Sequence, residues 1–168
     1  MSALQTTLET AVQDFLAQKN IAVTGVSRNK NEAANGIYRK LRDAGYNVYP
    51  INPNAETVEG VPCYPNVQAI AEQVDGVVVA SPPAATIQIM SDCVAANVHR
   101  VWIHRSIGEG SMHQDAVNFG KENNLTVIPG GCPMMFCEPV DIAHKCMKWW
   151  FSKTGKLPKQ VDMEHTVA

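Results

Sequence analysis

The stretch that decides the fold is residues 21–53, which read IAVTGVSRNKNEAANGIYRKLRDAGYNVYPINP. The apolar run at 21–26 predicts a buried strand, and the apolar spacing across 37–41 places those side chains on one face of a helix that Gly45 can terminate. A second strand is expected at 48–51, because the Asn-Pro pair after it cannot continue a central ladder. The stretch therefore predicts a strand–helix–strand unit with parallel strands.

The same alternation continues along the chain. Apolar runs predict strands at 76–80, 98–103 and 125–128, and periodic apolar residues predict helices around 87–94, 116–119 and 140–151. Ser111 is the expected N-cap of the helix that carries residues 116–119. Because parallel strands need crossover helices and these crossovers are right-handed, the expected fold class is α/β, with a doubly wound, mostly parallel five-stranded sheet of Rossmann type.

The two ends of the chain are expected to lie outside this sheet. Apolar residues at three-to-four spacing predict a helix over roughly residues 3 to 18, carrying Leu4, Leu8, Val12, Phe15 and Leu16. Periodicity is lost after Gly155, and Pro158 follows it. We therefore expect an N-terminal helix packing on the domain at 1–19, a Rossmann-type ligand-binding domain at 20–153, and an irregular C-terminal tail at 154–168.

Composition excludes several classes of function. The 168 residues are 45% hydrophobic and 18% charged with a formal net charge of −2, which is typical of one folded domain and not of a disordered or nucleic-acid-coating chain. The longest apolar run, at 77–80, is far shorter than the ~20 residues of a membrane span, and the N-terminus has no secretory signal pattern. Five cysteines without a CxxC pair indicate reduced thiols and no metal site. A cytoplasmic protein without nucleic-acid or membrane partners is expected.

The candidate ligand-binding residues directly follow the predicted strands, because open parallel sheets bind ligands outside the carboxyl ends of their strands. Gly25 allows a tight turn, the amides of Val26 and Ser27 and of the helix start near Asn35 and Gly36 can face an anion, and Arg28 and Lys30 add positive charge. This pattern is typical of a diphosphate cradle; the alternative is an ordinary polar loop. The other strand-end candidates are Asn52, Pro53, Ser81, Pro82, Pro83, Arg105 and Cys132.

Two absences weaken the case for a nicotinamide cofactor. Gly25 is not followed by the glycines of the GxGxxG dinucleotide fingerprint. The second strand ends in Asn52 and Pro53 instead of the acid that binds the ribose 2′-hydroxyl of NAD. A different ligand with a phosphate chain remains compatible with the loop.

Beyond residues 21–53, the segments GVPCYPNV, VDGVVVASPP, VWIHRSIGEGS and GGCPMMFCEPVDIAHKCMKWWFSKTGKLP complete a recognisable set. Together, across Ile21 to Lys159, the chain resembles the small stand-alone CoA-binding proteins, whose single domain is similar to the nucleotide-binding domain of the succinyl-CoA synthetase alpha subunit. The combination of GxSRN, VYPxNP and CPMM is specific, although each piece alone is weak.

The resemblance implies a CoA site. In that site Gly25 to Arg28 hold the diphosphate, Asn52 and Pro53 border the adenosine, and residues 81–83 line the nucleotide. The chain departs from the family pattern after the Asn-Pro pair, where residues 54–56 read NAE instead of carrying a cation for the 3′-phosphate. Arg105 is a candidate replacement for that cation.

The resemblance favours a CoA or acyl-CoA binding protein without catalysis of its own, because succinyl-CoA synthetase-like chemistry uses a further domain with a phosphorylated histidine. The alternatives are a small NAD- or CoA-dependent enzyme using His104 or Cys132, and a nucleotide-sensing interaction subunit. Cys132 is either beside a pantetheine thiol or a structural cysteine, and His104 and His113 lack a relay partner in the sequence. Of Trp149 and Trp150, one is expected to dock the last helix on the sheet.

Overall fold

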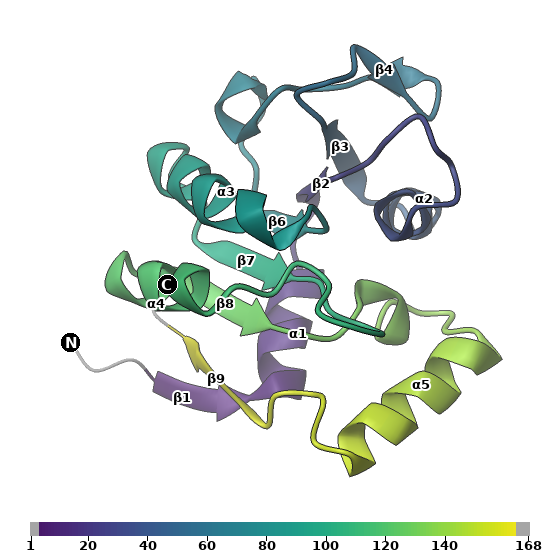
Figure 1. Cartoon of the computed structure of the whole chain (residues 1–168), viewed down its shortest axis with the longest axis vertical. Coiled ribbons are helices and arrows are strands. Elements are labelled where there is room, and N and C mark those ends of the chain that lie inside the picture. Colours follow the sequence, from purple (N-terminus) through teal and green to yellow (C-terminus); the bar gives the residue numbers. More distant parts are fainter. Residues whose placement is uncertain (1–3, 164–168) are drawn as a thin grey trace.

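A computed structural model describes residues 4–163 of the chain. Its centre is a five-stranded parallel sheet made of β2 (Asn20–Thr24), β3 (Asn47–Ile51), β6 (Gly76–Val79), β7 (Arg100–Ile103) and β8 (Thr126–Pro129) (Figure 1). The strand order is β3-β2-β6-β7-β8, and each neighbouring pair is parallel. From β2 the chain adds β3 on one side and then β6, β7 and β8 on the other, so the order of strand addition reverses between β2 and β6. This α/β, Rossmann-like arrangement confirms the predicted fold class and the five strands.

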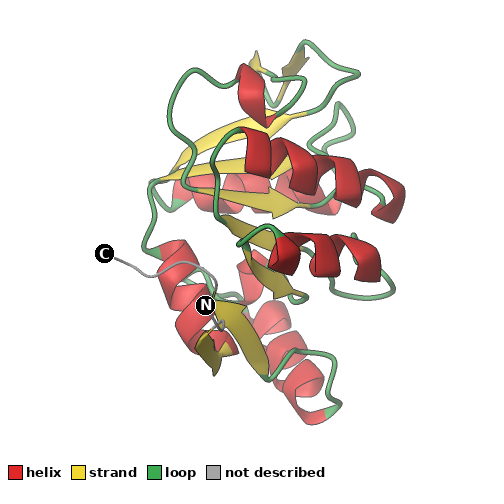
Figure 2. Ribbon diagram, turned by 90° about the vertical axis from the view of Figure 1, so that its left-hand side faces the viewer, coloured by secondary structure: helices red, strands yellow, loops and turns green. Residues whose placement is uncertain are grey.

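Helices cover both faces of the sheet (Figure 2). They are α1 (Leu8–Leu16), α2 (Ala33–Asp43), α3 (Pro83–Ala95), α4 (Gln114–Glu122) and α5 (Ile142–Lys153). Short 3-10 segments, η1 (Val67–Ala69) and η2 (Pro133–Met135), and a small antiparallel hairpin of β4 (Thr57–Val58) and β5 (Val61–Pro62) complete the connections. None of the helices among residues 4–163 is long and apolar enough to cross a membrane.

Alternating side chains of each strand build two separate cores. In β7, Trp102 points to the core under α1 and α2, whereas Val101 and Ile103 point to the core under α3 and α4. The Trp102 indole donates a hydrogen bond to the carbonyl oxygen of Gly130 at 2.8 Å and meets the ring of Phe15 edge-on. Both faces of the strands are therefore buried, which explains their continuous apolar runs.

The N-terminal segment differs from the predicted helix at residues 3–18. Residues Leu4–Thr7 form strand β1, which pairs antiparallel with β9 (Gln160–Met163), and the helix begins only at Leu8, capped by the Thr7 hydroxyl. Leu4 is 74% exposed, so it does not belong to the apolar stripe of the helix. The structure within the predicted irregular tail is likewise a strand over 160–163, with Val161 buried. Residues 1–3 and 164–168 lie outside the described part of the chain, and the division into three parts stays a prediction.

Two further local predictions were wrong. Ser111 is not the cap of α4, because the helix begins at Gln114 after His113, and the Ser111 carbonyl oxygen instead accepts a hydrogen bond from the Thr86 hydroxyl at 2.7 Å. Neither Trp149 nor Trp150 docks α5: they are 61% and 55% exposed, and Phe151 is the buried aromatic residue of that helix.

Candidate functional site

The loop between β2 and α2 lies at the topological switch point of the sheet, where the order of strand addition reverses. Gly25 starts this loop with a φ of +83°, and a Cβ atom there would lie 2.4 Å from the carbonyl oxygen of Ala80 at the end of β6. The Thr24 hydroxyl accepts a hydrogen bond from the Ala80 amide at 3.2 Å and contacts the Ser81 hydroxyl at 2.9 Å. Only glycine combines this backbone conformation with so close an approach, so Gly25 brings the two strand-end loops together.

Asn35 fixes the shape of the loop from within α2. Its side chain is fully buried; Oδ1 accepts a hydrogen bond from the Ser27 amide at 3.0 Å, and Nδ2 donates to the Ser27 carbonyl at 2.8 Å. The sequence led us to expect the Ser27 amide to face an anion. In the structure this amide already donates its hydrogen bond to Asn35. Asn35 thus orders the loop and does not itself present an amide to a ligand.

The start of α2 also differs from the expectation. The amides of Asn35 and Gly36 both donate to the carbonyl oxygen of Glu32, so they belong to the first helical turn. The helix begins at Ala33 after a cap position, Glu32, whose side chain makes no capping hydrogen bond. Because the first amides of a helix point outward along its axis, the anion-facing groups belong to the Ala33 turn, two residues earlier than predicted.

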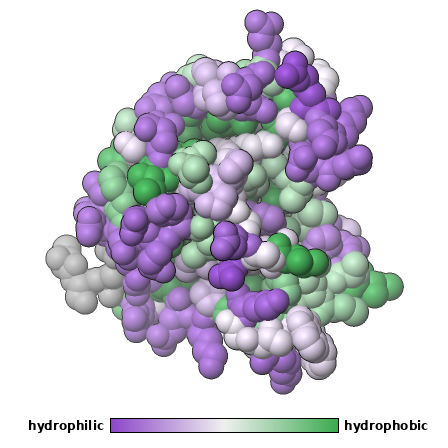
Figure 3. All heavy atoms as spheres, in the orientation of Figure 1, coloured by the Kyte–Doolittle hydropathy of each residue, from purple (hydrophilic) through white to green (hydrophobic). Residues whose placement is uncertain are grey.

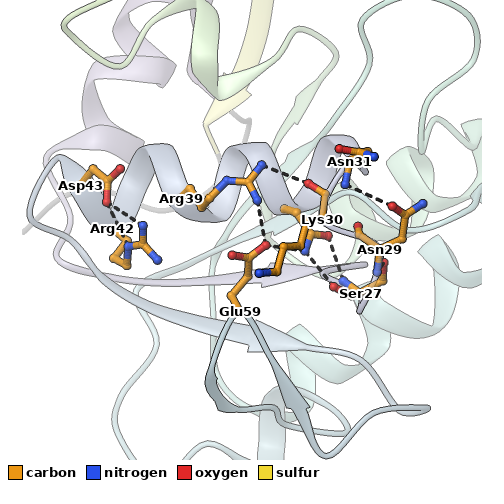
Figure 4. Close-up of polar contacts among 9 residues, drawn as sticks. Ser27, Asn29, Lys30, Asn31, Arg39, Arg42, Asp43 and Glu59 are labelled. Atoms are coloured by element: carbon orange, nitrogen blue, oxygen red, sulfur yellow. Dashed lines mark hydrogen bonds and ion pairs between the residues drawn. The ribbon is translucent and has the colours of Figure 1, made fainter.

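A second set of polar contacts supports the loop from the β4–β5 hairpin. Glu59, with a φ of +51° and a side chain only 7% exposed, accepts hydrogen bonds at 2.8 Å from Asn35 and from Arg39. Arg39 also donates to the Lys30 carbonyl oxygen at 3.0 Å, and Figure 4 shows Arg39 between Glu59 and Lys30. The sequence analysis missed the ion pair between Arg39 and Glu59. The Glu-Gly dipeptide at 59–60 indicates a turn there, and this was the only sign of it in the sequence.

Residues 27–31 also bond among themselves. The Ser27 hydroxyl accepts from the Asn29 amide at 3.1 Å, and the Asn29 side-chain oxygen accepts from the Asn31 amide at 3.2 Å (Figure 4). Arg28 and Lys30 are exposed beside these turns. The loop is therefore held by its own hydrogen bonds, and its two cations face solvent, where an anion can reach them.

The end of β3 lies directly against this loop. The Asn52 side chain donates to the Val26 carbonyl oxygen at 3.0 Å, and its own Oδ1 accepts from the Asn54 amide at 2.9 Å. The hydrogen bonds of Asn52 hold the end of β3 against the loop, and the expectation that Asn52 and Pro53 border an adenosine stays a prediction. The exposed Glu56 nearby brings negative charge and no cation to this end of the sheet.

Two hollows flank the loop. The β3-end cavity, about 430 Å³, is lined by Asn52, Pro53, Asn54, Ala55, Glu56, Cys63 and Pro65. The α2–α5 cavity, about 340 Å³, is lined by Lys30, Asn31, Glu32, Ala33, Gly36, Arg39, His104, Ser106, Cys132, Met134, His144 and Met147. Asn52, which lines the β3-end cavity, donates a hydrogen bond to Val26 of the loop. Lys30, which belongs to the loop, lines the α2–α5 cavity. Both hollows therefore border the loop between β2 and α2, one at the end of β3 and the other beside α5.

The predicted site residues divide among these places. Asn52 and Pro53 line the β3-end cavity, and Lys30, Gly36 and Cys132 line the α2–α5 cavity. Ser81, Pro82 and Pro83 line neither hollow; they sit beside the Gly25 turn and open helix α3. Sequence reasoning missed His144, Met134 and Met147, because nothing local indicates that α5 folds back over the loop.

Arg105 lies far from the Asn52–Pro53 pair at the end of β3. Its guanidinium donates to the Gly108 carbonyl oxygen at 3.2 Å within its own loop. In the strand order, β7 is three strands from β3, which is about 14 Å at ~4.8 Å per strand. The role of Arg105 as a replacement cation for the 3′-phosphate stays a prediction that this arrangement does not favour.

The nucleophile and base that the sequence offered in the α2–α5 cavity, Cys132 and His104, are both buried. Burial lowers the pKa of His104 to about 4, so the imidazole is neutral at pH 7. Burial raises the pKa of the Cys132 thiol to about 11, which leaves it protonated. His144 contacts Asp141, the N-cap of α5, through Nδ1 at 2.6 Å.

A parallel sheet with a polar, internally bonded loop at its switch point and two hollows beside that loop has the arrangement of the nucleotide-binding α/β domains. The chain belongs to the CoA binding domain family, whose pattern matches residues 19–138.

Curated relatives share this segment. Acetate–CoA ligase (ADP-forming) II of Archaeoglobus fulgidus is 29% identical over 89 residues, which is 52% of this chain and 13% of the ligase. The chain thus spans about one eighth of that relative. The uncharacterized protein YneT of Bacillus subtilis is 24% identical over 130 residues, 77% of this chain and 88% of that protein. The family therefore includes a small protein as well as a segment of large ligases.

Solved structures agree with these relatives. A hypothetical protein from Pyrococcus horikoshii is 27% identical with a TM-score of 0.73, covering 80% of this chain and 92% of the other. The dinucleotide-forming acetyl-coenzyme A synthetase 1 of Ca. Korarchaeum cryptofilum, in complex with phosphate and ADP, is 26% identical with a TM-score of 0.61 over 73% of this chain and 27% of the other.

Proposed function

We propose that the chain binds coenzyme A or an acyl-CoA, with the ligand diphosphate at the loop between β2 and α2. The observation that carries the proposal is the preformed loop itself: Asn35 and Asn52 hold its backbone while Arg28 and Lys30 stay exposed. Charge-assisted contacts to phosphate are among the stronger hydrogen bonds in proteins, and a rigid loop loses little entropy when it makes them.

The two hollows offer separate places for the two ends of this ligand. Coenzyme A has a nucleotide at one end and a flexible pantetheine arm at the other. The β3-end cavity, bordered by Asn52 and Pro53, would take the adenosine, and the α2–α5 cavity, with its methionines, would take the arm. Asn52 stands where an NAD-binding domain has an acid, which supports CoA over NAD.

The proposed function is binding without catalysis. His104 is neutral and buried, and the Cys132 thiol is protonated, so neither group is prepared for proton transfer or nucleophilic attack at pH 7. Enzyme active sites shift pKa values toward the working pH, whereas burial here shifts both away from it.

Calorimetric titration of the chain with CoA, acetyl-CoA, NAD and NADP tests the ligand. CoA is expected to bind more tightly than NAD; equal affinities, or binding of NAD alone, would refute the assignment. Arg28→Ala should weaken CoA binding by about 10- to 100-fold and leave thermal stability unchanged, since the side chain is exposed. The matched control is Arg42→Ala, at the far end of α2, where Arg42 pairs with Asp43 (Figure 4).

The absence of catalysis has its own test. Acetyl-CoA incubated with stoichiometric protein should stay intact, as followed by chromatography of the thioester and free CoA. Release of CoA above the protein-free rate, lost in His104→Gln, would promote the small-enzyme alternative. Activity that survives both His104→Gln and Cys132→Ser would indicate a different group or a contaminant.

A further inference from the structure

Helix α5 has a weakly buried inner face. Phe151 is its one fully buried side chain among the described residues, with His144, Met147 and Lys148 half-buried on the same side. The Lys148 ammonium lies over the Phe136 ring at 4.2 Å. These contacts dock α5 beside η2 and the α2–α5 cavity. The helix lies beyond residues 19–138, the segment that matches the family.

The outer face of α5 is also apolar. Ile142, Cys146, Trp149 and Trp150 are spaced by four, seven and eight residues, which places them within an arc of about 100° on the side away from Phe151. Ile142 is 80% exposed, and Trp149 and Trp150 are 61% and 55% exposed. We call these four residues the outer stripe. In Figure 3, strongly hydrophobic surface projects at the right-hand edge, where α5 begins in Figure 1.

An apolar stripe of this kind is unusual on a surface helix. A helix that is apolar on two faces is normally covered on both, and contiguous exposed aromatic surface marks an interaction site. With residues 4–163 in place the outer stripe is still exposed. The molecule therefore presents a surface that a partner would cover.

The charges around the outer stripe fit a second copy of the same helix. Acidic groups lie at the start of α5, at the exposed Glu138 and at Asp141, whereas the exposed Lys153 lies at its end. Two such helices packed antiparallel bring the acidic start of each against the basic end of the other. Lys145, at the edge of the stripe, has a stem long enough to extend into solvent.

We infer that the outer stripe is a homodimer interface, in which two α5 helices pack antiparallel about a two-fold axis near Cys146. Counting residues outward from Cys146 places Ile142 of one copy opposite Trp150 of its partner, and the reverse. Trp150 of each copy then covers Ile142 of the other, and the same patch is used on both copies, as a two-fold dimer requires.

The size of the stripe predicts a weak dimer. Taking ~250 Å² for a fully exposed tryptophan, the two tryptophans offer about 290 Å² per copy. With Ile142 and Cys146 the pair of copies buries on the order of 800–1,000 Å², below the ~1,200 Å² of a standard stable interface. Dimerisation should therefore depend on concentration in the micromolar range. This inference does not depend on the proposed CoA function.

Sedimentation equilibrium of the whole chain over a micromolar concentration series tests the inference. The average mass should rise toward twice the monomer, and Trp150→Glu and Ile142→Glu should each keep it at the monomer value. Ser152→Glu, on the same helix outside the stripe, is the matched control and should dimerise like the wild type. Circular dichroism and thermal unfolding establish that the variants are folded.

A second measurement avoids substitution in the stripe's aromatic residues. Mild oxidation should cross-link two copies through Cys146, giving a reducible dimer that is lost in Cys146→Ser. A chain that stays monomeric at high concentration and forms no such cross-link would overturn the inference. If the protein stays monomeric and co-sediments with anionic phosphatidylglycerol vesicles, the outer stripe binds a lipid surface and the dimer inference is overturned. The lysines of α5 would then attract the anionic lipid headgroups.

Discussion

Replacing His104 with glutamine should make the stability of the protein less dependent on pH. His104 is 6% exposed at the end of β7, where its amide donates to the Val79 carbonyl oxygen. Burial lowers the pKa of its imidazole to about 4 in the folded protein. In the unfolded chain the same group titrates near ~6.5. Between pH 4 and pH ~6.5 the imidazole is therefore mostly protonated in the unfolded state and mostly neutral in the folded state.

The sign and size of the effect follow from proton linkage. Stability contributed by the neutral histidine is present above pH ~6.5 and is lost as the pH falls toward 4. At pH 5 the unfolded state is stabilised by about 2 kcal/mol relative to pH 7.5, and by roughly 3 kcal/mol once both states are protonated. Glutamine has the polarity of the imidazole and does not titrate, so the variant should lack this loss.

Urea unfolding at pH 7.5 and pH 5, followed by circular dichroism, measures the difference. The decrease in the free energy of unfolding should be about 2 kcal/mol smaller in His104→Gln than in the wild type. Val79→Ala, a cavity-forming change in the neighbouring strand, should lower stability by about 1–2 kcal/mol at both pH values and keep the wild-type pH dependence. An equal pH dependence in wild type and His104→Gln would refute the burial argument.

Two other substitutions and labels probe the site. Gly25→Ala should lower the free energy of unfolding by at least ~2 kcal/mol, or the melting temperature by about 4–8 °C. The reason is that the new Cβ would lie 2.4 Å from the Ala80 carbonyl oxygen. The control Gly45→Ala has a similar φ and open space around it, so its free energy of unfolding should fall clearly less. Iodoacetamide on the dilute native protein should modify the exposed Cys146 and reach Cys132, whose pKa burial raises to about 11, only after denaturation. Peptide mapping that finds Cys132 labelled in the native state would contradict this.

The main sheet could be predicted because its signal is local. Strands buried on both faces are continuous apolar runs, such as Gly76–Val79, and the helices between them carry their own periodicity. The pairing of β1 with β9 could not be predicted in this way. Leu4 fits a helical spacing, but strand pairing with residues at the other end of the chain determines its conformation, and no local pattern reports such a partner.

Part of the arrangement around the candidate site could also be predicted from local signals. Strand ends identify the loop at Gly25 and the Asn52–Pro53 pair, because topology places both at one edge of the sheet. Which atoms are free to meet a ligand was not predictable, since the Ser27 amide is bonded to Asn35 and Glu59 reaches Asn35 from a separate hairpin. Such assignments depend on side-chain geometry across distant segments.

The β1–β9 ribbon has a mechanical consequence. Leu4 lies opposite Met163 and Thr7 opposite Gln160, so the two outermost residues form one pair at the same end of the ribbon. Tension between the N- and C-terminal ends would therefore load one rung at a time and peel the ribbon open, instead of shearing all its hydrogen bonds together. A two-stranded ribbon has little stability of its own. An unfolding machine that pulls on either end would then meet little resistance until it reached α1 from the N-terminal side or α5 from the C-terminal side.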